Sequence, residues 1–160
     1  MEFRHLEEVL LQYGEKVKQT YQNKLDSEGI TASGSLRDTV SVQVDVDGNK
    51  FEVALNLNSY WKWIEGGRPP TQNNGNGELR RAILQWIRTK PVIPQPFNGK
   101  LPTEEQLAYL ISRKIHNEGY EGKGVLKDSL EENEDFLINV QYAMLEDIEK
   151  DINEVLILFK

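Results

Sequence analysis

Few residues in this chain have the types and spacings that catalysis or metal binding requires. Its two histidines, His5 and His116, fit neither an HxxxH nor an HExxH pattern of metal ligands. We interpret both as solvated histidines on helix surfaces. Adjacent carboxylates such as Glu104-Glu105 are common, but helix N-termini favour acids electrostatically. The sequence therefore predicts no catalytic residue, no bound metal and no cofactor, and we expect that the protein is not an enzyme.

Nucleophile and phosphate-binding motifs are missing as well. The chain contains no cysteine, which excludes disulfides, thiolate nucleophiles and thiolate metal sites. It has no G-x-S-x-G motif and no P-loop. The segment "GYEGKG" (119–124) is rich in glycine, but it lacks the Ser or Thr after its lysine and the preceding strand that a phosphate cradle needs.

Tryptophans and basic residues in the middle of the chain suggest a different kind of chemistry, the stacking of bases in a basic groove. The tryptophans are Trp61, Trp63 and Trp86, and the basic residues around them are Lys62, Arg68, Arg80, Arg81, Arg88 and Lys90. A single-strand nucleic-acid-binding module is therefore one possible function. Against it, the isoelectric point is about 5.0. The tryptophans also share predicted helix faces with isoleucines, which is typical of core anchors.

Charge is distributed unevenly along the chain. The net charge is −7, and residues 126–160 alone hold ten acidic and three basic residues. Residues 59–100 hold seven basic and two acidic residues. Such asymmetry can steer partners, including copies of the same chain, although both segments can also be ordinary solvated faces.

The length of 160 residues with 38% apolar residues predicts one domain, 1–160. The N-terminal stretch lacks the basic and apolar regions of a signal peptide, and no apolar run is long enough to span a membrane. The patterns below predict an α+β fold, in which a small antiparallel sheet is packed by about four helices.

Residues 39–58 predict a β-hairpin. Val40, Val42, Val44 and Val46 alternate with polar residues, as do Phe51, Val53, Leu55 and Leu57. A turn at Gly48-Asn49 pairs 46 with 51, 44 with 53 and 42 with 55, so that all apolar side chains share one face. The other face is polar, and we expect helices on one side only.

Five segments predict helices. Residues 1–25 carry an apolar stripe from Phe3 to Leu25, with Gly14 inside it. Ser59 is the predicted N-cap of a short helix that ends at Gly66-Gly67, and Tyr60, Trp63 and Ile64 are expected to anchor it on the hairpin. The next predicted helix covers 78–90, with Leu79, Ile83, Trp86 and Ile87 on one face. A helix over 103–118 has a Thr103–Gln106 capping box and an inward stripe of Leu107, Leu110, Ile111 and Ile115. An acidic C-terminal helix over 132–158 repeats Phe136, Val140, Met144, Ile148, Ile152 and Val155 at helical spacing.

Residues 91–102, "PVIPQPFNGKLP", hold four of the six prolines and predict an extended arm. Such an arm can lie on a neighbouring subunit or on its own domain. The polar loop "TQNNGNG" (71–77) is expected to be flexible and exposed.

The stretch from Tyr60 to about Leu130 resembles the head–tail connector and tail-completion proteins of tailed bacteriophages, most closely the versions from phages of Bacteroides-type gut bacteria. The matching segments are "YWKWIEGGRPP", "AILQWI", "KPVIPQPFNGKLPTEEQLAYLISRKIHNEG" and "GVLKDSL", preceded by the hairpin "ASGSLRDTVSVQVDVDGNKFEVALNL". The loop "TQNNGNGELR" departs from the shorter, proline-containing turn expected there.

The resemblance implies a structural protein of the virion neck, present in the host cytoplasm during assembly. Its copies would form a ring of six or twelve between the portal or an adjacent neck ring and the tail proteins, with genomic DNA passing through the channel. Opposite charges and unpaired sheet edges would suit head-to-tail contacts between copies. From exposure and charge we expect the contacts at Trp61, Arg68, Arg80, Arg81, Pro94, Pro96 and Phe97. A small regulatory partner of a larger enzyme is a further alternative.

Overall fold

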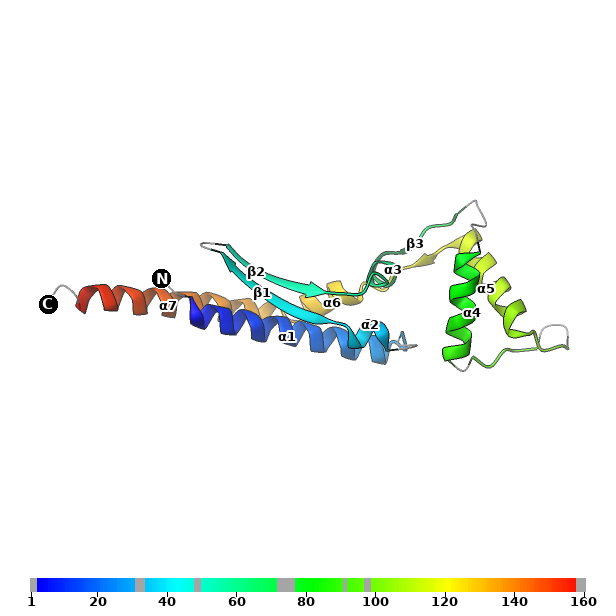
Figure 1. Ribbon diagram of the computed structural model, residues 1–160, viewed down its shortest axis with the longest axis horizontal. Coiled ribbons are helices and arrows are strands. Elements are labelled where there is room, and N and C mark those ends of the chain that lie inside the picture. The colour runs from blue at the N-terminus through cyan, green and yellow to red at the C-terminus, as the bar shows by residue number, and fades with distance from the viewer. Residues whose placement is uncertain are drawn as a thin grey trace.

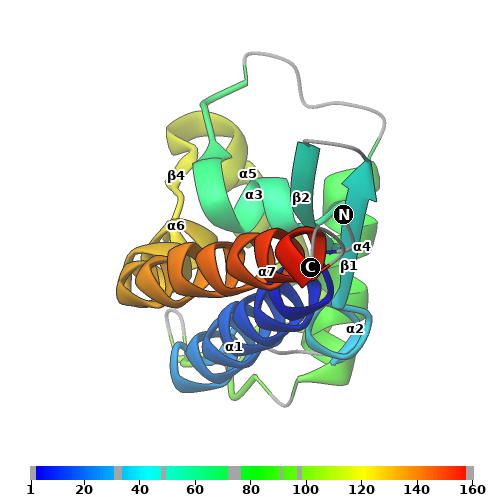
Figure 2. The same ribbon diagram turned by 90° about the vertical axis from the view of Figure 1, so that its left-hand side faces the viewer.

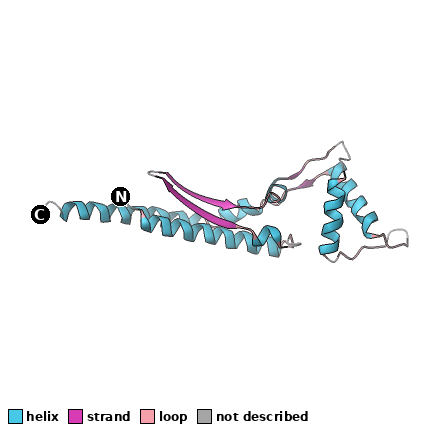
Figure 3. Cartoon of the chain, viewed as in Figure 1, coloured by secondary structure: helices cyan, strands magenta, loops and turns pink. Residues whose placement is uncertain are grey.

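The computed structural model describes residues 3–30, 34–47, 50–71, 77–90, 92–96 and 99–157. Their order confirms the α+β class, with long helices at both ends of the chain and a small antiparallel sheet between them (Figures 1 and 3). The elements are α1 (Arg4–Ser27), α2 (Ser35–Asp38), β1 (Ser41–Asp47), β2 (Lys50–Asn56), α3 (Trp61–Gly66), β3 (Gly67–Arg68), α4 (Glu78–Thr89), α5 (Glu104–Glu118), β4 (Tyr120–Glu121), α6 (Val125–Glu131), the 3-10 turn η1 (Glu134–Phe136) and α7 (Leu137–Ile157).

The hairpin of β1 and β2 has the register that the sequence predicts. Val46 lies opposite Phe51, Val44 opposite Val53, and Val42 opposite Leu55. The turn residues Gly48 and Asn49 lie outside the described residues. One face of the hairpin packs on α1 (Figure 1). The two valines of the central pair and their neighbours on this face are only half-buried.

Helix α1 confirms the predicted apolar stripe, because Leu6, Leu10, Val17, Tyr21 and Leu25 are buried. Gly14 is also buried, at the place where the helix approaches the hairpin most closely. A Cβ atom on Gly14 would lie 3.0 Å from Cγ1 of Val53 and closer still to Cγ1 of Val42. The absence of a side chain at this position therefore lets helix and sheet meet.

The chain after the hairpin forms a second, two-stranded ribbon that the sequence did not predict. Here β3 pairs with β4, with Gly67 opposite Glu121 and Arg68 opposite Tyr120. Gly67 has a φ of 70° and packs against the backbone of β4, where a side chain would collide. The glycine-rich segment 119–124, considered above as a phosphate cradle, therefore contains β4, one of the two strands of this ribbon.

Helix α3 corrects two predictions. Its first residue is Trp61, it has no side-chain N-cap, and the Ser59 hydroxyl bonds to the Asn58 side chain instead. Tyr60 and Trp63 are exposed, so neither anchors the helix on the hairpin, whereas Ile64 packs on the core as expected. The reason is that α3 is short, and its Ile64 side is the one that packs on the core.

Helices α4 and α5 pack against each other at the opposite end of the molecule from the C-terminus (Figure 1). Ile83, Ile87 and Ala108 are buried between them, with Leu79, Leu107, Ile111 and Ile115 packed around. The Thr103–Gln106 capping box is confirmed. Trp86 and Leu110, which we expected to point inward, are exposed, because two helices cover only one side of each other.

His116 is a further correction. It is only 7% exposed, and its Nδ1 lies 2.5 Å from the Thr71 hydroxyl oxygen. Its carbonyl accepts a hydrogen bond from the Thr71 N–H at 2.8 Å. The residue is therefore part of the junction between the ribbon and α5, and the expected surface histidine is His5 alone.

The final helix begins later than the predicted 132, because η1 precedes it and α7 starts at Leu137. The side facing α1 carries Val140, Ala143 and Asp147, while Met144, Ile152 and Val155 are exposed. Half of the predicted stripe, namely Phe136, Val140 and Ile148, is half-buried, and the other half is exposed. Antiparallel packing along α1 explains the difference, because α7 runs past the start of α1 and its last turns have nothing beside them (Figures 1 and 2).

The proline-rich segment contains no helix, and its described parts, 92–96 and 99–102, contain one isolated bridge residue, Lys100. Val92 packs on the α4–α5 cluster, and Ile93 is 89% exposed. The arm therefore starts on its own helices, and its next apolar residue points away from them.

Candidate assembly surfaces

The residues predicted from sequence to form an assembly interface fall in three separate places. Trp61 and Arg68 are half-buried near α3 and β3, and Arg80 and Arg81 are exposed on α4. Pro94 is half-buried and Pro96 exposed in the arm, while Phe97 lies outside the described residues. The structure does not bring these residues into one patch, so they are three candidate contact regions.

The first region is a corner formed by residues 63–71. The Arg68 guanidinium carbon lies 5.7 Å from the centre of the exposed Trp63 ring, in a cation–π arrangement. Burial raises the pKa of Tyr120, which lies opposite Arg68 in the ribbon, and the positive charge of Arg68 partly offsets that rise. The corner thus presents one indole face with a fixed positive charge beside it.

This corner is fixed in place by a residue that sequence reasoning missed. The Glu65 carboxylate accepts hydrogen bonds from the backbone N–H groups of Leu126 at 2.8 Å and Lys127 at 3.0 Å. These are free donors at the start of α6, a position that favours a negative charge. The Lys123 N–H adds a bond to the Ile64 carbonyl at 2.7 Å. The end of α3 is thereby attached to α6.

The second region is the surface of the α4–α5 hairpin. The Arg80 guanidinium carbon lies 5.8 Å from the centre of the Tyr109 ring, across from α4 to α5. Arg113 stands one turn after Tyr109, so the same side of α5 carries a second exposed positive charge. Arg88 pairs with Glu104 at 3.0 Å on another part of the hairpin.

A fourth region was not predicted, and it is the side of α7 that faces away from α1. Apolar residues that α1 leaves exposed on α7 include Leu137, Ile138, Met144, Leu145, Ile152, Val155 and Leu156. The Leu145 side chain, for example, belongs to a residue that is 60% exposed. Ile138, Leu145 and Ile152 recur every seven residues, as do Ile148 and Val155, which is the pattern of a helix seam that packs on another helix. This repeat is the signal that could have found the surface from sequence.

The opposite side of α7 is held firmly on α1. The Asp147 carboxylate, 7% exposed, accepts hydrogen bonds from the N–H groups of Leu6 at 2.9 Å and His5 at 3.3 Å. The rings of Tyr13 and Phe136 stack with centres 5.9 Å apart. Because these contacts fix the rotation of α7, its apolar outer side cannot turn inward.

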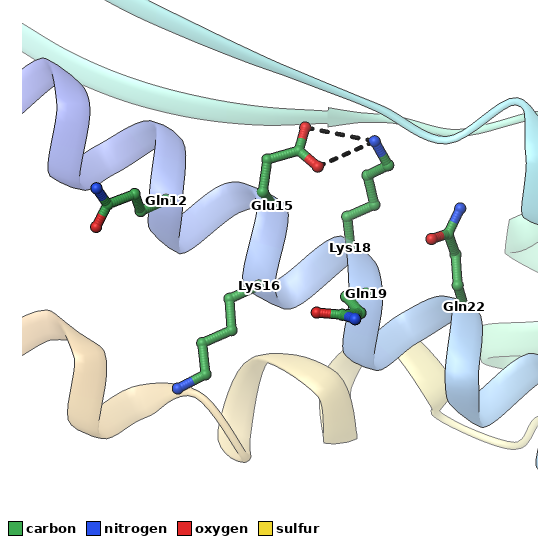
Figure 4. Close-up of a pocket in the computed structure, with 6 residues that line it drawn as sticks. All are labelled: Gln12, Glu15, Lys16, Lys18, Gln19 and Gln22. Atoms are coloured by element: carbon green, nitrogen blue, oxygen red, sulfur yellow. Dashed lines mark hydrogen bonds and ion pairs between the residues drawn. The ribbon is translucent and has the colours of Figure 1, made fainter.

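A ligand-binding cavity is not evident among the described residues. The depression shown in Figure 4 is lined by Gln12, Glu15, Lys16, Lys18, Gln19 and Gln22, all from α1. Lys18 pairs with Glu15 at 3.1 Å, and the other side chains project in different directions (Figure 4). Side chains of one helix do not surround a small molecule. The described residues also include no group of three or more His, Asp or Glu placed to hold a metal ion.

Comparison of the chain with protein-family models, curated proteins and solved structures finds no match. In the described part of the chain, no helix combines the length and apolar character needed to cross a membrane.

Proposed function

We propose that this protein is a structural component of the virion of a tailed bacteriophage. Six or twelve copies would form a ring in the neck, between the portal or an adjacent neck ring and the tail proteins, around the path of the DNA. The observation that carries the proposal is the apolar outer side of α7. A group of exposed apolar side chains on a helix whose orientation is fixed marks a site of protein contact. The resemblance of residues 60–130 to neck proteins gives that contact its setting.

Two further features support an assembly role. Within the described residues the β1–β2 sheet has two strands, so each strand has one edge there that a neighbouring subunit can extend. The molecule is elongated, with the free end of α7 and the α4–α5 hairpin at opposite ends (Figure 1). A subunit of this shape can touch two neighbours at once, which a ring requires.

An amber mutation in the gene, in a phage that encodes this chain, tests the proposal. Without the protein, we expect DNA-filled heads and separate tails in electron micrographs of the lysate, and complementation from a plasmid should restore joined particles. Infectious particles of normal shape that lack the chain by mass spectrometry would overturn the proposal.

Charge reversal tests the two predicted contact regions within such particles. Arg68→Glu and Arg80→Glu are expected to reduce joined particles in the complementation assay while the purified chains keep wild-type circular dichroism. Lys62→Glu, an exposed reversal on α3, is the matched control. Full complementation by both Arg variants would remove these residues from the interface.

A second function, single-strand nucleic-acid binding, gains support from one observation. Trp63 is 49% exposed rather than part of the core, and Arg68 lies beside its ring. An exposed indole with a neighbouring cation can stack a base. Binding of a labelled oligonucleotide at low micromolar concentration, weakening steeply with salt and lost in Trp63→Ala, would favour this function.

A further inference from the structure

We propose that the apolar outer side of α7 in one copy packs on the side of the α4–α5 hairpin that carries Arg80, Tyr109 and Arg113 in the next copy. This inference deepens the proposed function and rests on it in one respect, namely that copies of the chain contact each other. It assigns the two surfaces that make the contact.

The first step concerns α7. Its outer apolar residues, among them Leu145, Ile152 and Leu156, lie on a helix that also carries the exposed acids Glu149 and Glu154. Glu149 is exposed at the border of the apolar side, between Leu145 and Ile152 in sequence. A partner for this surface must therefore offer apolar contact and positive charge. A second α7 offers the apolar contact but brings like charges together, which is unfavourable.

The second step concerns the α4–α5 hairpin, which has the complementary properties. Its two helices carry five basic and four acidic residues, of which Arg88 pairs with Glu104 and Lys114 with Glu118, while Arg80, Arg81 and Arg113 are exposed. Tyr109 and Leu110 are exposed on α5 among these charges, and Arg80 lies over the Tyr109 ring. The hairpin thus offers aromatic and aliphatic area with the positive charges of Arg80 and Arg113 beside it, which suits the outer side of α7.

The third step concerns geometry. The free end of α7 and the α4–α5 hairpin lie at opposite ends of the molecule (Figure 1). They cannot meet within one chain, so the match can be satisfied only between copies. Because the two surfaces differ, the contact is heterologous, and repeating it gives a ring when the rotation between copies closes.

Two variants distinguish this contact from others. Leu145→Lys/Ile152→Lys alters only the α7 surface, and Arg80→Glu/Arg113→Glu alters only the hairpin surface. All four residues are exposed, so both variants should keep wild-type circular dichroism and melting temperature. Gln12→Lys/Gln19→Lys, on the exposed side of α1, is the control with the same added charge as the α7 variant.

Sedimentation velocity of the purified full chain, from about 1 µM to about 1 mM, gives the readout. We expect wild type and control to form species larger than two chains, and each variant alone to associate at least tenfold more weakly. An equimolar mixture of the variants retains one good junction, between α7 of the hairpin variant and the hairpin of the α7 variant. It should therefore form two-chain species and nothing larger.

Several results would overturn the inference. A wild type that stays monomeric throughout, or a mixture that stays monomeric, removes the contact. A hairpin variant that associates like wild type indicates pairing of α7 with α7. Because the chain lacks cysteine, mixing Leu145→Cys with Tyr109→Cys copies adds an independent check, in which a bismaleimide should cross-link one copy of each. Oligomers through this contact in a protein absent from particles would refute the neck function while leaving the inference intact.

Discussion

Two carboxylates in this protein bond to the starts of helices that are far from them in sequence. Asp147 bonds to the first turn of α1, and Glu65 bonds to the first turn of α6. Neither helix start has a capping side chain of its own among the described residues. A negative charge at these positions satisfies free N–H groups and interacts favourably with the helix dipole.

Replacing Glu65 with glutamine should therefore destabilise the fold. The amide keeps the shape and one acceptor but loses the charge, and we expect the free energy of unfolding to fall by about 1–2 kcal/mol. Urea denaturation followed by circular dichroism measures the change. Glu121→Gln, an exposed carboxylate in the neighbouring strand, should change stability by less than about 0.5 kcal/mol. An equal loss in both variants would contradict the capping role.

Tyr21 makes stability depend on pH in the alkaline range. Burial, and to a lesser extent the negative charge of Glu65, raises the pKa of Tyr21 to about 12 from its ordinary value of 10.0. Above pH 10 the unfolded chain loses this proton while the folded chain keeps it, so stability falls as the pH rises. The contribution is fully present below pH 10 and lost by about pH 12, a change of about 2–3 kcal/mol.

Urea denaturation between pH 9 and 12 tests this expectation. Tyr21→Phe should flatten the part of the pH dependence that Tyr21 causes, whereas Tyr142→Phe, an exposed tyrosine on α7, should leave it unchanged. The same slope in Tyr21→Phe and wild type would show that other groups cause the alkaline loss.

Residue-level predictions from sequence failed where the partner is distant. His116 was placed on the surface because its neighbours are polar, but its contact with Thr71 spans 45 positions. The bonds of Glu65 span 61 and 62 positions. No local pattern distinguishes these residues from solvated ones, because their partners, Thr71 and the start of α6, come from distant parts of the chain.

At the scale of elements, predictions succeeded where the signal is local. The hairpin register follows from alternation with a two-residue turn, and the Thr103–Gln106 capping box lies within four residues. Which residues of α7 are covered could not be predicted, because its apolar residues occupy more than one side and only the packing on α1 decides which side is inward. The prediction that Trp63 and Trp86 are core anchors was wrong for a similar reason, since a short helix or a two-helix hairpin leaves one side of each helix uncovered.

Gly14 in α1 gives a prediction whose sign is opposite to helix propensity. In an open helix, Gly→Ala stabilises by about 1 kcal/mol. Here the new methyl group would meet Cγ1 of Val53 at 3.0 Å and overlap the Val42 side chain, so α1 and the hairpin must separate. We expect Gly14→Ala to lower the free energy of unfolding by about 1–3 kcal/mol, measured by urea denaturation.

Gly66 in α3 supplies the matched control. A Cβ atom there would have no neighbour within 4 Å, so Gly66→Ala should be neutral or slightly stabilising. In the double variant Gly14→Ala/Val42→Ala, the smaller side chain at position 42 leaves space for the new methyl group. The two substitutions together should therefore lower the free energy of unfolding by less than the sum of their separate effects. A stabilised Gly14→Ala protein would mean that the helix and the hairpin are not in close contact.

At the scale of the whole molecule, two separate clusters of buried apolar side chains are found among the described residues. Tyr21, Leu25, Val40 and Val125 form the first cluster, among α1, the hairpin and α6. Ile83, Ile87 and Ala108 form the second, between α4 and α5. The β3–β4 ribbon and a bond from Lys90 Nζ to the Gly29 carbonyl at 2.5 Å join the two parts.

Two clusters with so few joining contacts should open as two cooperative units. Ile87→Ala removes a buried side chain from the second cluster, so amide hydrogen exchange measured by mass spectrometry should speed up in α4 and α5 and stay unchanged in α1. Leu25→Ala, the matched change in the first cluster, should speed up exchange in α1 and β1. If either substitution accelerated exchange equally in both parts, the molecule would unfold as a single unit, and the α4–α5 hairpin could not serve as a separate body that docks on a neighbouring copy.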